Sequence, residues 1–236
     1  MSLFINGDDF GMSKSCTLAI AEALDKGLID GTTMMANGEY FDEAAALAAS
    51  RGFAQKIGVH LNLTEGVPLT GEIKKVSAFV ADGKFHKGYL KNPRPLDEFE
   101  QTAVMIELSA QINRVKQAGV TADRADSHHY IHTFVHIAPL VAKACKENGI
   151  KRIRINRTFD TPERPMITDG RIENAYWRAQ GFETTARFGR LSDIKHGEIP
   201  DDTEIMVHPD YDKNGVLVDR AGVKDGFPFG VKIKKI

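Results

Sequence analysis

The chain contains little cysteine: Cys16 and Cys145 are the two cysteines among 236 residues. Both fall inside segments with helical periodicity, and they are far apart in the sequence, so no Cys-x-x-Cys pair occurs. Disulfide scaffolds and cysteine-rich zinc sites need several closely spaced cysteines. We therefore interpret the two residues as small buried thiols.

The sequence also lacks a long apolar run. Spanning a bilayer requires about 20 consecutive apolar residues, and no segment approaches that length. The N-terminal apolar stretch, Leu3–Ile5, is soon followed by Asp8 and Asp9, which is unlike a secretory signal peptide. These absences predict a cytoplasmic protein with no membrane partner.

Neither sign of charge is in excess, because 31 Lys and Arg residues oppose 32 Asp and Glu residues, for a net charge of -1. Without a positive field, nucleic acid is not an expected partner. The length suits one large α/β domain, and no repeat, low-complexity tract or polar linker divides the chain. We therefore predict a single domain over residues 1–236.

Strand-like segments alternate with segments of helical periodicity along the chain. The predicted strands are 3–6, 32–37, 56–63, 122–126 and 151–156, with weaker signals at 184–188 and 204–208. The predicted helices are 13–24, 41–51, 96–119 and 137–148, with a weaker signal at 172–180. Such alternation indicates a parallel α/β sheet, open or closed into a barrel. Residues 64–95 have little periodicity and are predicted to form a long loop, either a functional lid or disordered.

Unusual polar residues fall where the predicted strands end, and this favours a barrel-like form with its site at the carboxyl ends of the strands. Asp8 and Asp9 follow the first strand, His60 lies late in the third, Asp126–His129 follow the next, and His208 follows the last. One carboxylate and two imidazoles suit Zn²⁺ or another divalent ion, and three ligands leave a position for water. A second carboxylate can then act as a base.

Each of these signals also has a structural explanation. The two aspartates are common turn and capping residues, and His60 fits a hydrogen-bonded core position. His128 and His132 are four residues apart, so they share a face of any helix that starts there, with or without a metal. His208 before Pro209 fits a simple strand exit. The joint placement of these residues at successive strand ends favours the metal site.

Four segments carry a resemblance to a known family: Asn6–Ser13 (NGDDFGMS), Thr32–Gly38 (TTMMANG), Gly58–Thr64 (GVHLNLT) and Asp126–His132 (DSHHYIH). In this order and spacing they resemble the YdjC-like carbohydrate deacetylases, which include the chitooligosaccharide (diacetylchitobiose) deacetylases. The resemblance spans residues 3 to about 157. It implies a distorted, TIM-barrel-like (β/α) barrel related to the polysaccharide deacetylases.

The resemblance also implies a site. Asp9, His60 and His128 would hold one divalent metal ion, zinc or magnesium, while Asp8 would be the catalytic base and His208 the general acid. The residues expected around these, as supports of the ligands or as substrate contacts, are Asp126, His129, His132, Arg154 and Arg157. For the two arginines, a surface ion pair remains an equally good explanation.

The sequence departs from the family pattern at three places. Gly7 stands where the family commonly has Ala, Tyr130 replaces a frequent histidine, and Asp210 follows His208-Pro209 where the family often has Gly. The last departure lies directly beside the residue implied as the general acid. The tail 226–236 matches no pattern and has no assigned role.

We therefore predict a metal-dependent hydrolase that removes acetyl groups from N-acetylated amino sugars, with a small carbohydrate as its partner. One alternative is an amidase or esterase acting on another small acylated compound. The other is a non-catalytic sugar-binding homologue, which has no need of a base at Asp8. A homodimer is expected only from the frequency of twofold pairing among soluble enzymes.

Overall fold

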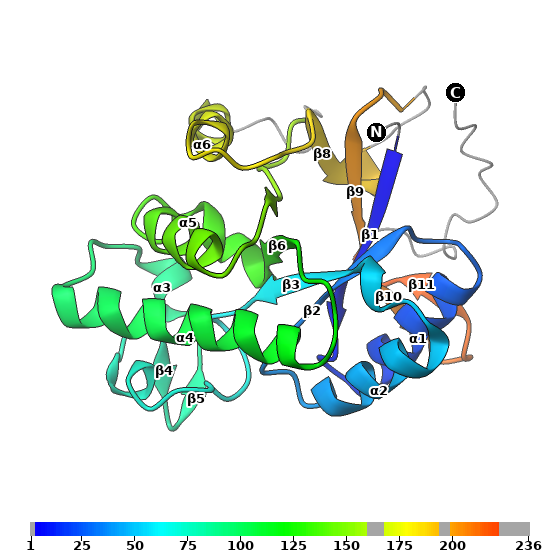
Figure 1. Cartoon of the computed structure of the whole chain (residues 1–236), viewed down its shortest axis with the longest axis horizontal. Helices are drawn as coiled ribbons and strands as arrows, with labels where there is room; N and C mark the ends of the chain where they lie inside the picture. Colours follow the sequence, from blue (N-terminus) through cyan, green and yellow to red (C-terminus); the bar gives the residue numbers. More distant parts are fainter. Residues whose placement is uncertain (1–2, 160–167, 194–198, 222–236) are drawn as a thin grey trace.

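A parallel sheet of seven strands forms the centre of the protein (Figure 1). The computed structural model describes residues 3–159, 168–193 and 199–221. The sheet order is β7-β6-β3-β2-β1-β9-β8. Its strands are β1 (Leu3–Phe10), β2 (Gly31–Met34), β3 (Ile57–Leu61), β6 (Arg124–Ser127), β7 (Arg152–Ile153), β8 (Arg187–Arg190) and β9 (Thr203–Val207). The predicted parallel α/β fold is confirmed.

The two edges of this sheet, β7 and β8, are joined by the chain segments beside them. The Ile153 amide donates to the Glu183 carbonyl at 3.1 Å, and the Thr158 amide donates to the Phe188 carbonyl at 2.8 Å. Ile155, Phe188 and Met206 pack together across the same gap. The sheet therefore curls into the distorted barrel that the resemblance implies.

The main helices of the described chain are α1 (Lys14–Asp25), α2 (Phe41–Arg51), α4 (Glu98–Gln117), α5 (Ala138–Glu147) and α6 (Thr168–Ala179). Helix α2 has the bounds that its Ala-rich sequence predicts, and it ends at Gly52 in the left-handed conformation (φ 72°). Helix α4 begins where the Asp97 carboxylate accepts from the Glu100 amide, a capping interaction. None of the described helices is long and apolar enough to cross a membrane.

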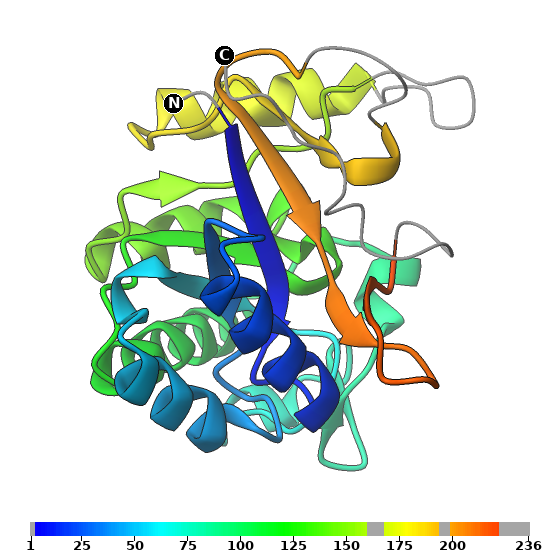
Figure 2. The same ribbon diagram turned by 90° about the vertical axis from the view of Figure 1, so that its right-hand side faces the viewer.

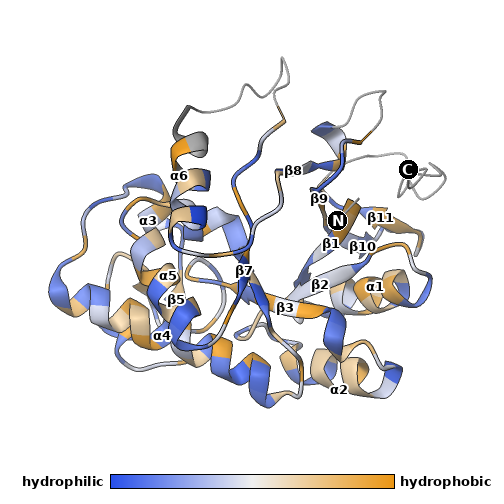
Figure 3. Cartoon of the chain, turned by 45° about the horizontal axis from the view of Figure 1, so that its top comes forward, coloured by the Kyte–Doolittle hydropathy of each residue, from blue (hydrophilic) through white to orange (hydrophobic). Residues whose placement is uncertain are grey.

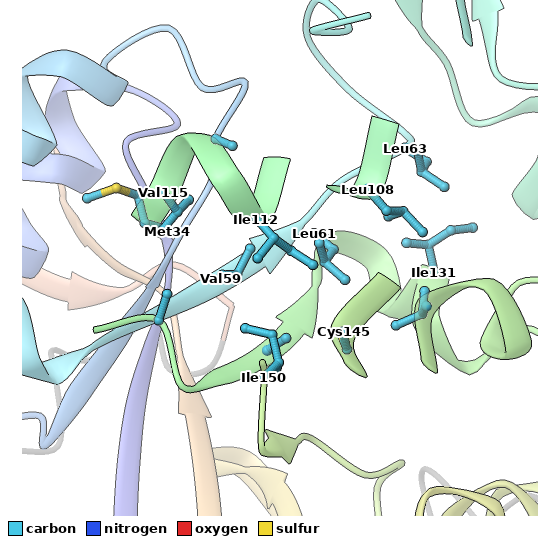
Figure 4. Close-up of a cluster of buried hydrophobic side chains, with 14 of the residues drawn as sticks. Met34, Val59, Leu61, Leu63, Leu108, Ile112, Val115, Ile131, Cys145 and Ile150 are labelled. Carbon is cyan, nitrogen blue, oxygen red and sulfur yellow. The ribbon is translucent and has the colours of Figure 1, made fainter. Parts of the chain in front are cut away.

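The outer face of the sheet packs against α4 and α5 through apolar side chains (Figure 4). Val59 and Leu61 of β3 are fully buried, as are Leu108 and Ile112 of α4. Burying a side chain of this size contributes about 1.5–3 kcal/mol. In Figure 3, β3 is largely hydrophobic and α4 is mixed, as expected for a buried strand and an amphipathic helix. Cys145, on α5, lies in this layer and both cysteines are buried and unpaired, as predicted.

The prediction of a structureless loop over residues 64–95 is wrong. This segment contains a 3₁₀ turn at Ile73–Lys75, a two-stranded hairpin of β4 (Val80–Ala81) and β5 (Lys84–Phe85), and the short helix α3 (Gly88–Lys91). Phe79 and Tyr89 are buried and stack with ring centroids 4.7 Å apart. A few well-placed aromatic residues fold this segment, although it lacks periodicity. We call it the insert.

A second feature absent from the sequence-based predictions is a hairpin after β9. Its strands are β10 (Pro209–Tyr211) and β11 (Leu217–Asp219), and it lies against α1 at the end of β9 remote from the N-terminus (Figure 2). The Tyr211 hydroxyl donates to the Glu22 carboxylate of α1 at 2.5 Å. The hairpin brings the residues at its base, His208 and Arg220, toward the carboxyl end of β1.

Candidate functional site

Asp8 and Asp9 lie inside the end of β1, and not after it as predicted. The register between β1 and β2 shifts between Gly7 and Phe10, and Asp9 has a left-handed backbone (φ 74°). Neighbouring residues of a regular strand point to opposite faces. Here the irregularity brings both carboxylates into the same buried region, where Asp8 contacts Arg154 and Asp9 contacts His128.

Asp9, His60 and His128 lie together. Asp9 Oδ1 is 2.8 Å from His128 Nδ1 and 3.1 Å from His60 Nε2. One potential ligand atom of each residue lies within 4.8 Å of those of the other two, and all three residues are buried. The structure thus assembles, from three strand ends, the residues that the resemblance implies as metal ligands.

The electrostatics of this cluster fit a divalent cation. His60 Nε2 is buried beside Asp9, but within the described part of the chain it has no hydrogen-bond partner of adequate geometry. Burial alone would lower the pKa of His60, but the negative charge of Asp126 and its hydrogen bond raise the pKa to about 10. The pocket therefore stabilises a positive charge at this imidazole. A metal ion would supply that charge in place of the proton, as metal binding at histidine requires.

Each of the three clustered residues has a charged partner on its other side. His60 Nδ1 lies 2.7 Å from Asp126 Oδ1, and His128 Nε2 lies 3.3 Å from Glu65 Oε2. The remaining oxygen of Asp9 accepts from Arg220 Nη2 at 2.8 Å. A carboxylate behind an imidazole is the arrangement that orients a metal-bound histidine, and the supporting role of Asp126 stays a prediction.

Arg154 is the centre of a buried ion-pair network. Its guanidinium donates to both oxygens of Asp8, at 2.6 and 2.8 Å, and Nη1 also lies 2.7 Å from Asp126. Its Nε donates to Glu204 at 2.7 Å, and the residue is 3% exposed. A surface ion pair is therefore wrong for Arg154, and direct substrate contact does not fit a side chain so enclosed. Burial opposes the charge of Asp126, but Arg154 and His60 lower the pKa of that carboxyl below its ordinary value.

The neighbouring residues His129 and His132 are not part of the group formed by Asp9, His60 and His128. His129 and Tyr130 have left-handed backbones (φ 54° and 55°), so the segment is not a regular helix and does not pair His128 with His132. His132 is fully buried, with Nδ1 2.5 Å from the Ser127 hydroxyl and Nε2 3.1 Å from the Arg154 carbonyl. Both ring nitrogens are therefore taken up by contacts inside the protein, and the role predicted for His132 stays a prediction.

His129 and Arg157 occupy more open positions. His129 Nδ1 lies 2.9 Å from the Thr64 hydroxyl, and its ring centroid is 4.0 Å from that of His128. Burial and the nearby charge of His128 lower the pKa of His129 to about 4. Arg157 is half-buried and forms an ion pair with Asp193. The predicted roles of both residues stay predictions.

His208 follows β9 directly, one residue beyond the pairing of Val207 with Gly7 of β1. Its amide donates to Asp219 at 2.9 Å, while its buried Nδ1 has no hydrogen-bond partner among the described residues. Burial lowers the pKa of His208, although Asp8 and Asp9 oppose this shift. The charges of the two aspartates thus act on this imidazole, and its role as general acid stays a prediction.

Two charged residues at the site, Glu65 and Arg220, were not predicted. Glu65 stands next to the Gly58–Thr64 motif, but glutamate on a long loop gives no signal of its own. Arg220 follows the missed hairpin, whose turn contains Asn214-Gly215, with Gly215 at φ 75°. Asn-Gly between two apolar segments is a known hairpin signal, and it was the one clue available for this residue.

The arrangement described so far is that of a (β/α) barrel with a candidate metal centre at the carboxyl ends of its strands. The family model of YdjC-like proteins matches residues 2–226, so the chain belongs to the YdjC-like family. This confirms the family resemblance found in the sequence.

Curated relatives agree with this assignment, and a solved structure agrees with the fold. The chain is 31% identical over 231 residues to a carbohydrate deacetylase of Brevibacillus brevis, covering 95% of this chain and 87% of the relative. It is 32% identical over 212 residues to a carbohydrate deacetylase of Listeria welshimeri, covering 89% and 81%. A crystal structure from Enterococcus faecalis V583, of a protein to which cellobiose-phosphate cleavage has been ascribed, matches with a TM-score of 0.71 at 22% identity, covering 90% of this chain and 82% of that one. The last similarity supports the fold.

Proposed function

We propose that this protein is a metal-dependent hydrolase that removes acetyl groups from N-acetylated amino sugars. The observation that carries the proposal is the cluster of Asp9, His60 and His128 beside Asp8, in a chain whose relatives are named carbohydrate deacetylases. Amide hydrolysis needs an activated water, a base for its proton and an acid for the leaving amine. The site offers a residue for each of these requirements.

Asp9, His60 and His128 would hold the ion. Two imidazoles and one carboxylate suit zinc better than magnesium, which prefers oxygen ligands. When bound, a divalent ion lowers the pKa of a coordinated water to about 7 and polarises the substrate carbonyl. Asp126 keeps the His60 ring oriented from behind.

Asp8 would take the proton of the attacking water at a carboxylate oxygen. Arg154 holds both oxygens of Asp8, so the position of the base is set before substrate arrives. His208, on the neighbouring strand end, would donate a proton to the amine nitrogen as the carbon–nitrogen bond breaks. The products are acetate and the free amino sugar.

The insert would contribute to the sugar-binding cleft. Glu65 lies at the start of the insert and Lys87 directly before α3, and the two form an ion pair at 2.6 Å. The Glu65 carboxylate also lies near His128 and His129. These polar groups are half-exposed and suit the hydroxyl groups of a neutral carbohydrate. A near-neutral chain is consistent with such a substrate, because an uncharged sugar needs no electrostatic steering.

Acetate release tests the proposal. Purified protein loaded in turn with zinc, magnesium, manganese or cobalt is incubated with diacetylchitobiose, and free acetate is measured enzymatically. We expect release with at least one metal and none after chelation. No release with any metal would overturn the substrate class, and release only from acetyl esters would favour the alternative esterase.

A further inference from the structure

The backbone of Glu65 is held rigidly just beyond β3. Its carbonyl accepts from Asn62 Nδ2 at 2.6 Å and from Asn37 Nδ2 at 3.0 Å, and its amide donates to Asn62 Oδ1 at 3.2 Å. Asn62 and Asn37 are themselves buried. The Glu65 side chain therefore extends from a fixed backbone position, although 41% of this side chain is exposed.

From this point the carboxylate faces His128. Glu65 Oε2 lies 3.3 Å from His128 Nε2, while His128 Nδ1 faces Asp9 on the opposite side of the ring. His60 shows the same pattern with its nitrogens exchanged, Nε2 toward Asp9 and Nδ1 toward Asp126. Each imidazole of the candidate metal centre thus lies between Asp9 and a second carboxylate.

The two outer carboxylates differ in how they are held. Asp126 is buried and fixed by Arg154 from inside the barrel. Glu65 is fixed from outside by Lys87, whose Nζ lies 2.6 Å from Glu65 Oε1. Glu65 and Lys87 both belong to the insert, so this folded segment meets the candidate metal centre at the contact between Glu65 and His128.

We propose that Glu65 is a positioning residue that orients His128, with its Nδ1 toward Asp9, and that Lys87 holds Glu65 in place. The inference rests on the proposed metal-dependent function and assigns part of its metal affinity to the insert. Removing a carboxylate that supports a metal-bound histidine typically weakens metal binding by about 10- to 100-fold.

The test is zinc affinity, measured by competition with a chromophoric chelator on chelator-stripped protein. We expect Glu65→Ala to weaken zinc binding by about 10- to 100-fold. Glu65→Gln should weaken it less, because the amide oxygen still accepts from Nε2–H. Glu72→Ala is the matched control, since Glu72 is an exposed glutamate of the insert, and it should bind like the wild type. Circular dichroism of the metal-free proteins confirms folding.

Long-range ¹H–¹⁵N spectra provide a second readout. The zinc-loaded wild type should show His128 with its proton on Nε2, and this signal should weaken or broaden in Glu65→Ala. A merely structural role of Glu65 would not move this signal. Unchanged affinity in both Glu65 variants, with zinc bound by the wild type, would overturn the inference and leave the proposed function intact. Failure of the wild type to bind any divalent metal would instead overturn the proposed function.

A double-mutant cycle tests the part assigned to Lys87. Lys87→Met should weaken zinc binding when Glu65 is present and have no effect in the Glu65→Ala background. Equal effects in the two backgrounds, including no effect in either, would show that Lys87 does not act through Glu65.

Discussion

The two faces of β3 have opposite chemistry. Its outer residues, Val59 and Leu61, pack against α4 and α5 in an apolar layer, whereas His60, between them, faces Asp9 and Asp126. The interior of a TIM barrel is commonly filled by branched apolar side chains. Here the inner face near the strand ends is charged, while the outer layer follows the usual rule.

This difference separates stability from function. Apolar burial stabilises in proportion to the area removed from water. A buried ion-pair network has a large desolvation cost and contributes less net stability than its contacts suggest, but losing one partner leaves a buried charge without compensation. We infer that the outer layer stabilises the fold, and that the charged interior fixes the geometry of the site.

The largest expected effect is on catalysis. Asp8→Asn should lower the rate of acetate release by about 10²- to 10⁴-fold, since it removes the proposed general base. Metal content, measured by atomic emission, should be unchanged because Asp8 is not among the three proposed ligands. A variant with wild-type turnover would refute the role of Asp8. If the wild type itself shows binding of sugar without turnover, and Asp8→Asn binds equally well, the non-catalytic alternative is favoured.

The second largest expected effect is the loss of stability when the buried ion-pair network is broken. Arg154→Met should lower the free energy of unfolding by about 3–5 kcal/mol, because Asp8, Asp126 and Glu204 lose a common partner. Urea denaturation measures this change. The surface pair Arg51–Asp25 offers a control, and Arg51→Met should change stability by no more than about 1 kcal/mol. Similar losses in the two variants would contradict the contrast between interior and surface charge.

Truncating a side chain of the apolar layer should lower the stability of the protein and leave its zinc affinity unchanged. Leu108→Ala, on α4, should cost about 2–5 kcal/mol of unfolding free energy, since Leu108 is fully buried and leaves a cavity. At a temperature where the variant is folded, its zinc affinity should equal that of the wild type. A large drop in zinc affinity would show that the two faces of the sheet are coupled.

The smallest effect concerns a charge pair outside the barrel. Arg94 donates hydrogen bonds to Glu100 at the start of α4 and lowers the pKa of that carboxyl. A lowered folded-state pKa contributes stability above the unfolded pKa of about 4.3, and that stability is lost as the pH falls through the folded value. Glu100→Gln should therefore be less stable than the wild type at pH 7, with the difference shrinking below about pH 4 in urea titrations. A constant difference from pH 7 to pH 2 would contradict this.

Local rules of sequence predicted much of the fold. Ala-rich periodicity and a terminal glycine predicted α2 at both ends, and alternation of strands and helices predicted the parallel sheet. The end of β1 was misplaced because the register shift at Asp9 has no local signal. The insert was missed for a related reason: Phe79 and Tyr89 stabilise it by packing against each other, which no periodicity reveals.

The residues of the site also divide into those that the sequence predicted and those that only the fold revealed. Asp8, Asp9, His60 and His128 belong to motifs that are contiguous in the sequence, so the residues themselves indicated metal chemistry. Arg154, Glu65 and Arg220 carry no motif, and each acquires its place from a partner far away in the chain. Whether Arg154 is a surface residue or the centre of a buried network depends on how the sheet curls.

The sequence by itself determined the alternation of sheet strands and main helices, the family and the residues proposed as ligands, because these depend on local patterns and on order along the chain. The tertiary structure decided which charges surround those ligands. It placed Arg154 beneath Asp8, Glu65 behind His128 and Arg220 on Asp9. The physical reason is that a buried charge is stabilised by its neighbours in space, and these come from strands, the insert and a hairpin that only the folded barrel brings together.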